Sequence, residues 1–150
     1  MTARSPFPHT AEPQPERKYF TLAEANRALG YVSRIAEDIR TAYRHAVHLQ
    51  ERLEDAADGP ELNEMQRDYE QTIAKLNRFV DELHEVGVEL KDYDQCLVDF
   101  PALHEGREVY LCWKRGEDEI RAWHEIDSGY MGRQDVSRLK QTPQDQKQAD

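Results

Sequence analysis

Apolar residues recur every three or four positions along two long segments of this chain, and this spacing is the strongest constraint on its fold. In the first segment they are Leu22, Ala25, Leu29, Val32, Ala36, Ile39, Tyr43, Ala46 and Leu53, with Gln50 the one polar member of the series. In the second they are Leu62, Met65, Tyr69, Leu76, Phe79, Leu83 and Val86, with Thr72 in the same series. Such a period near 3.5 predicts two amphipathic helices.

The ends of the two helices also carry recognisable signals. Thr21 followed three residues later by Glu24 predicts a capping box at the start of the first helix. Gly59 and Pro60 interrupt the pattern, and Gly87 follows the last apolar position of the second helix, where glycine favours a helix C-terminus. The short break predicts an antiparallel helical hairpin over about residues 21–86.

Further apolar residues widen the stripe of this hairpin beyond one helix–helix seam; they are Ile35, Val47, Leu49, Ile73 and Val80. A two-helix hairpin alone does not cover so wide a stripe. We therefore expect self-association, with a dimer favoured, or a coiled-coil contact with a partner helix.

After Gly87 the apolar period changes to two. The segments "CLVDFPA", "EVYLCWK" and "EIRAWHEI" are rich in β-branched and aromatic residues, and "VELK" precedes them. They predict an antiparallel β-meander of three strands over about residues 88–127, with "VELK" as a fourth. The separators "HEG" and "KRG" each suggest a three-residue loop with glycine at positive φ. The fold class is therefore α+β, with the helical hairpin first and the meander second.

Both ends of the chain are polar and contain little that could form a hydrophobic core. Residues 1–17 are rich in proline, and residues 135–150 are rich in Gln, Asp and Lys. We expect two disordered tails around a single domain at 18–134, in which residues 128–134 form a return loop.

The charge of the chain limits its partners and its location. The formal net charge is −10 and no basic stripe is present, which argues against nucleic acid and against an anionic membrane surface. No apolar run approaches the length of about 18 residues that spans a bilayer. A cytoplasmic location follows as the simplest expectation. Cys96 and Cys112 are interpreted as buried free thiols.

Four motifs resemble, in order, the segments of an uncharacterised prokaryotic family, domain of unknown function 2203. They are "YFTLAEANRAL", "LVDFPA", "EVYLCWK" with the following "GE" and "EI", and "WHEIDSGYMGRQ", and the resemblance covers about residues 19–134. The resemblance implies the same order of elements and carries no catalytic residue. Cys96 stands where the family often has Gly. Gly30 stands where it often has Pro, which removes an expected kink in the first helix.

Asp99 is the strongest candidate for a functional side chain. It lies in the middle of an expected strand between Val98 and Phe100, where a carboxylate needs a cation, a donor or a metal as its partner. One interpretation is an ion pair with Arg121 or Arg133 that fixes the sheet. The other is a divalent-metal site formed by Asp99, His124 and Glu125, in which His124 and Glu125 could instead do acid–base chemistry.

The strand register decides between these interpretations, because a slip of one residue exchanges the two faces of a strand. With two three-residue loops, one face holds Val98, Phe100, Tyr110, Cys112, Ala122 and His124. The other face then holds Asp99, Val109, Leu111, Trp113, Trp123 and Glu125. We favour this register, in which Asp99 does not meet His124; one more residue in the second loop would bring them together.

The loop "DSGYMGRQ" places Gly129 and Gly132 beside Arg133. Glycines at this spacing can expose backbone N–H groups to an anion, but the ordinary interpretation is a tight turn capped by Asp127.

Two functions remain open from the sequence. The favoured one is a non-catalytic protein that oligomerises or binds a partner through its hairpin. The alternative is a small enzyme or ligand-binding protein whose site on the sheet contains Asp99, Trp113, Trp123, His124, Glu125 and Arg133. No nucleophile–base pair, P-loop or dinucleotide motif occurs, so the balance leans away from an enzyme. No cofactor is expected beyond the metal of the alternative.

Overall fold

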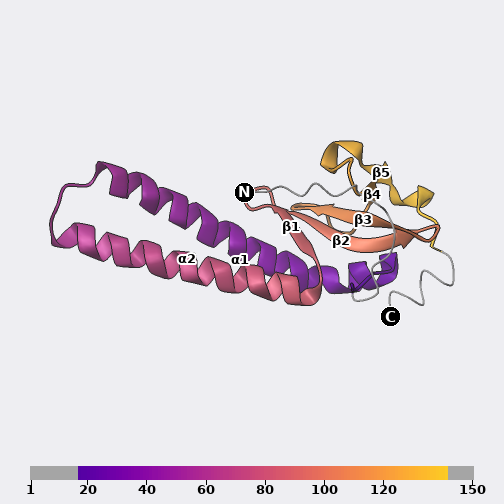
Figure 1. Cartoon of the computed structure of the whole chain (residues 1–150), viewed down its shortest axis with the longest axis horizontal. Helices are drawn as coiled ribbons and strands as arrows, with labels where there is room; N and C mark the ends of the chain where they lie inside the picture. The colour runs from indigo at the N-terminus through magenta and orange to yellow at the C-terminus, as the bar shows by residue number, and fades with distance from the viewer. Residues whose placement is uncertain (1–16, 142–150) are drawn as a thin grey trace. The chain divides into compact units, whose positions relative to one another are not determined.

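The computed structural model describes residues 17–141, which form two long helices followed by a sheet (Figure 1). The expected α+β class is confirmed. By their contacts these residues divide into two compact units, one of residues 30–98 and one that joins the N-terminal residues up to 29 with residues from 99 onward. The single domain expected for 18–134 stays a prediction. The expected tail at 1–17 lies, up to residue 16, outside the described residues.

Helix α1 spans Leu22–Asp55 and helix α2 spans Pro60–Val86. The predicted capping box is present: Thr21 N donates to Glu24 Oε1 at 2.9 Å, and Glu24 N donates to Thr21 Oγ1 at 3.0 Å. At the end of α2, Gly87 adopts φ 100°, the left-handed conformation that glycine supplies at lowest cost. The sequence signals for the helix ends are therefore correct.

Two side-chain contacts show how the helices run past each other. Tyr31 Oη donates to Glu82 Oε2 at 2.6 Å, and His45 Nε2 lies 3.4 Å from Asp68 Oδ2. Moving forward along α1 therefore means moving backward along α2, as an antiparallel hairpin requires. Neither helix is both long enough and apolar enough to span a membrane, as judged over the part of the chain that is described.

The sheet has the strand order β1-β2-β3-β4-β5. Its strands are β1 Glu89–Asp92, β2 Leu97–His104, β3 Arg107–Lys114, β4 Ala122–Glu125 and β5 Gln134–Asp135. The expected meander and its fourth strand are confirmed. The fifth strand was not expected: β5 pairs antiparallel with β4, Trp123 opposite Gln134, where the sequence suggested only a return loop.

The connection between β2 and β3 differs from the prediction. The strands leave only Glu105 and Gly106 between them, and both have positive φ, 51° and 85°. Positive φ at both central residues is the mark of a two-residue type I′ hairpin turn. The expected three-residue "HEG" loop is therefore wrong, and a two-residue loop reverses which residues of β2 share a face with those of β3.

The connection between β3 and β4 also differs, yet it preserves the expected faces. It spans residues 115–121, longer than a three-residue "KRG" loop, and the register sets Tyr110 opposite His124 and Cys112 opposite Ala122. Because the paired residues still have equal parity, Tyr110, Cys112 and His124 share a face as predicted.

Ordered structure continues past residue 134, where the sequence suggested a tail. The 3₁₀ helix η2 spans Val136–Arg138. Gln141 then accepts from Leu22 N at 3.0 Å and donates to Phe20 O at 3.2 Å, so it ties the C-terminal segment to the start of α1. Residues 135–141 of the expected tail are therefore ordered, and its remainder at 142–150 lies outside the described residues.

The same substitution, glycine to alanine, at two positions tests whether the β2–β3 turn requires positive φ. At both Gly30 and Gly106 an added Cβ would meet no atom within 4 Å, but only Gly106 has positive φ. We expect Gly106→Ala to lower the free energy of unfolding by about 1–2 kcal/mol. Gly30→Ala, in the middle of α1, should raise it by about 0.5–1 kcal/mol. Urea denaturation of both variants measures the two effects, and equal signs would contradict the turn assignment.

Candidate functional site

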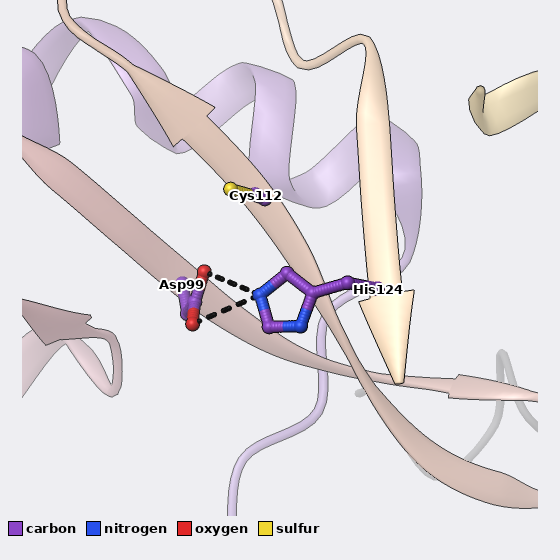
Figure 2. A group of neighbouring side chains, drawn as sticks. All are labelled: Asp99, Cys112 and His124. Carbon is purple, nitrogen blue, oxygen red and sulfur yellow. Dashed lines mark hydrogen bonds and ion pairs between the residues drawn. The ribbon is translucent and has the colours of Figure 1, made fainter. Parts of the chain in front are cut away.

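Three buried side chains from three neighbouring strands meet on one face of the sheet (Figure 2). Asp99 comes from β2, Cys112 from β3 and His124 from β4, with exposed fractions of 3%, 1% and 2%. Each offers one atom that can bind a metal ion, and these atoms all lie within 4.8 Å of one another. We call these three residues the Asp–Cys–His cluster.

The two-residue turn at Glu105–Gly106 creates this cluster. It inverts the parity between β2 and β3, so Asp99 joins the face of Cys112 and His124 in place of Val98 and Phe100. The favoured register, which separated Asp99 from His124, is therefore wrong for β2. The change of register comes from the β2–β3 loop, which is one residue shorter than expected. It does not come from an added residue in the β3–β4 loop.

His124 is held at both of its ring nitrogens. Nδ1 lies 2.7 Å from the backbone oxygen of Glu125, and Nε2 lies 3.1 and 3.2 Å from the two carboxylate oxygens of Asp99. A carbonyl oxygen only accepts, so Nδ1 must carry a proton. A neutral ring would then turn the lone pair of Nε2 toward a carboxylate. The contact therefore needs one more positive charge, either a proton between the two groups or a metal ion.

Cys112 stays a neutral thiol in the metal-free protein. Burial raises the pKa of the Cys112 thiol to about 12, and the charge of Asp99 adds to this rise while Arg133 opposes it. A thiolate forms in such a place only when a cation neutralises it, because burial penalises the charged form. Cys112 is thus an inert thiol alone and a potential ligand beside a metal.

The side chain of Glu125 does not reach the cluster. Its carboxylate binds the guanidinium of Arg107, with Arg107 Nε 3.2 Å from Oε1 and a closer contact from the second nitrogen. Glu125 contributes only its backbone carbonyl, which fixes His124. Of the predicted metal set, Asp99 and His124 therefore lie together with Cys112, whereas the carboxylate of Glu125 lies with Arg107.

The two tryptophans lie away from the cluster as well. Trp123 alternates with His124 on β4 and stacks on His104, with ring centroids 4.5 Å apart. Trp113 donates from Nε1 to the backbone oxygen of Glu117 at 2.8 Å. Both are buried at 4% exposure or less, which favours a role in the core of the sheet.

Arg133, by contrast, lies next to the cluster. Its terminal nitrogen donates to Glu117 Oε2 at 2.8 Å and lies 3.5 Å from the backbone oxygen of Cys112. Its guanidinium also stands 4.8 Å from the ring centroid of Tyr130. Of the six predicted site residues, the structure therefore brings Asp99 and His124 into contact, while Arg133 reaches the backbone oxygen of Cys112.

Cys112 is the site residue that the sequence interpretation missed. The expected strand faces already placed it with His124, but two isolated cysteines were interpreted as small buried hydrophobes. The sequence interpretation also missed an ion pair between Arg17 and Glu108. Arg17 lies 2.8 Å from Glu108 Oε2 and donates to the Tyr110 hydroxyl at 3.0 Å. Tyr110 is the cross-strand neighbour of His124.

The comparisons with known proteins identify a family but no function. The model of the family DUF2203, described as an uncharacterized conserved protein, matches residues 18–136. No curated protein and no solved structure matches the chain.

Breaking the buried pair of Asp99 and His124 should destabilise the protein far more than breaking an exposed pair of the same kind. We expect Asp99→Asn to lower the free energy of unfolding by about 3 kcal/mol, because it leaves a buried group without its charged partner. The matched control is Asp68→Asn in the exposed His45–Asp68 pair, which should change it by about 0.5 kcal/mol or less. Chemical denaturation at pH 7 without added metal compares the two, and similar small losses would refute a paired Asp99.

Proposed function

The chain belongs to the family of domain of unknown function 2203, and we propose that this member is a divalent-metal-binding protein whose ion is held by Asp99, Cys112 and His124. The observation that carries the proposal is the convergence of a carboxylate, a thiol and an imidazole, all buried, with ligand atoms within 4.8 Å of one another. These are the three kinds of side chain that bind zinc in proteins.

The geometry of His124 supports the proposal further. Histidines that bind metals commonly donate their other ring N–H to a carbonyl or carboxylate, which fixes the orientation of the ring. His124 Nδ1 makes this contact with Glu125 O at 2.7 Å, leaving Nε2 directed at Asp99. Zinc bonds of about 2.0–2.3 Å place tetrahedral ligand atoms about 3.3–3.7 Å apart. The Nε2–Asp99 distances of 3.1 and 3.2 Å are close to this spacing.

The donor set also favours a class of ion. A thiolate and an imidazole suit Zn²⁺ and related transition metals, whereas Mg²⁺ and Ca²⁺ prefer oxygen ligands alone. A metal ion would offset the two negative charges that Asp99 and Cys112 carry as ligands. We place the protein in the cytoplasm, where a reducing environment keeps Cys112 available as a thiol.

Metal binding can be tested with Co²⁺, which substitutes for zinc and shows a thiolate charge-transfer absorption. We expect the wild-type chain to bind one Co²⁺ per chain with this absorption, and excess Zn²⁺ to abolish it. Cys112→Ala should lose the absorption. Cys96→Ala is the matched control, since Cys96 is an equally buried thiol that donates to Ala36 O at 3.3 Å, and it should keep the absorption.

Two results would overturn the metal proposal. One is a wild-type chain that binds neither Co²⁺ nor Zn²⁺ in stoichiometric amount, in which case Asp99 and His124 form a structural ion pair. The other is an absorption that survives in Cys112→Ala and disappears in Cys96→Ala.

A second function, self-association through the hairpin, has its own support. Several apolar side chains of the two helices are only half-buried, among them Val47, Met65, Ile73, Phe79 and Val80. Such a stripe is the usual basis of coiled-coil contacts, and we propose that a second copy of the chain covers it. A homodimer is compatible with metal binding on the sheet.

The self-association proposal predicts a concentration-dependent dimer. The double variant Val47→Lys and Ile73→Lys puts charges on the half-buried stripe and should shift the chain to a monomer. Asn77→Lys is the control, because Asn77 is exposed on α2 and lies outside the apolar series. Sedimentation equilibrium distinguishes these states. Weak complexes have dissociation constants in the micromolar to millimolar range, so a wild-type chain that is still monomeric at about 100 µM would refute self-association.

A further inference from the structure

Arg133 has one donor group that no contact satisfies. Its Nε is buried and has no acceptor among residues 17–141, whereas its terminal nitrogen donates to both carboxylate oxygens of Glu117, at 3.0 and 2.8 Å. Glu117 therefore uses only one corner of the guanidinium. An unsatisfied buried donor destabilises the folded protein, and more so when the group is charged. A ligand oxygen that accepts a hydrogen bond from Nε would satisfy this donor.

Arg133 is also placed to act together with the Asp–Cys–His cluster. Its terminal nitrogen lies 3.5 Å from the backbone oxygen of Cys112. Its positive charge opposes the rise in the pKa of the Cys112 thiol that burial causes. The Tyr130 ring, 4.8 Å from the guanidinium, limits where the side chain can go. A fixed positive charge thus stands beside the residue that would carry the thiolate.

The loop before Arg133 holds the arginine in a defined place. Gly129 has φ 65°, and a Cβ added at Gly132 would lie 2.5 Å from Ser128 Cβ and Oγ, so this close packing needs glycine. The glycine pair that suggested an anion loop in the sequence therefore shapes the turn, and Arg133 supplies the charge.

We propose that Arg133 and the metal ion of the Asp–Cys–His cluster together bind a small oxyanion, a carboxylate or phosphate group. This inference rests on the proposed metal site. Three protein donors leave a tetrahedral ion one further position, which in zinc sites is taken by water or by an exogenous ligand. The planar guanidinium with its fork of N–H donors matches the oxygens of carboxylates and phosphates.

The test uses the full chain loaded with Co²⁺, titrated separately with acetate and with inorganic phosphate at constant ionic strength. The d–d absorption of Co²⁺ reports a change of ligand directly. In the wild-type protein we expect a saturable spectral change with at least one of the two anions. Arg133→Gln should weaken its apparent affinity at least tenfold, and Arg133→Lys should weaken it less.

Two control variants separate the anion contact from the loss of an ion pair. Glu117→Gln breaks the same ion pair but keeps the arginine, so it should bind the anion at least as tightly as the wild type. Arg138→Gln removes an exposed arginine in the 3₁₀ helix η2 and should leave the affinity unchanged. Thermal melting of each Co²⁺-loaded variant confirms that it is folded.

The outcomes distinguish the two proposals. Failure of the wild-type chain to bind Co²⁺ at all would overturn the metal site and with it this inference. Stoichiometric Co²⁺ binding without any spectral response to acetate or phosphate would overturn the anion site alone. An equal response in wild type and folded Arg133→Gln would also overturn it. If Arg133→Gln does not fold, equal weakening in Arg133→Lys and Glu117→Gln would show that only the ion pair mattered and contradict the proposal.

Discussion

The contact between Asp99 and His124 is the interaction on which the sheet of this protein depends. A carboxylate with 3% exposure is costly unless a positive charge lies beside it. His124 Nε2, 3.1 Å away, is that neighbour, but the carbonyl of Glu125 already takes the proton of Nδ1. The pair is therefore complete only with an added proton or a metal ion. The proposed metal ion would complete it, with Cys112 on the strand between them as its third ligand.

The two-residue turn at Glu105–Gly106 determines that these groups meet at all. In a sheet the side chains alternate between faces, so one residue more or less in a hairpin loop exchanges them. With the expected three-residue loop, Asp99 would lie beside Trp123 and Cys112 would face Val98. With the observed turn, Trp123 stacks on His104 on one face of the sheet, which is hydrophobic. The opposite, polar face holds the Asp–Cys–His cluster.

Much of this fold could be predicted from the sequence because its signals are local. The apolar period, the capping box at Thr21 and the terminal glycine at position 87 define the hairpin within a few residues. The common face of Cys112 and His124 also followed from the strand pattern. By contrast, β5 has only two residues, too few to show any period.

The site itself could be predicted only in part, for a physical reason that lies in the first turn. A type I′ turn requires positive φ at Glu105, a conformation that is uncommon for glutamate, so the sequence favoured a loop with only the glycine at positive φ. That choice moved Asp99 to the wrong face. The sequence nevertheless predicts Asp99 with His124 and Arg133 as site residues, because a carboxylate between apolar strand neighbours needs a partner. It does not predict Cys112, because an isolated cysteine has no spacing signal of its own.

The most direct test of the central claim is the X-ray absorption spectrum of the zinc-loaded protein at the zinc edge. Coordination by Asp99, Cys112 and His124 predicts one sulfur at about 2.3 Å together with nitrogen and oxygen scatterers at about 2.0 Å. The sulfur should vanish in Cys112→Ser and persist in Cys96→Ser. A first shell made only of oxygen and nitrogen in the wild-type protein would contradict a metal ion bound by this cluster.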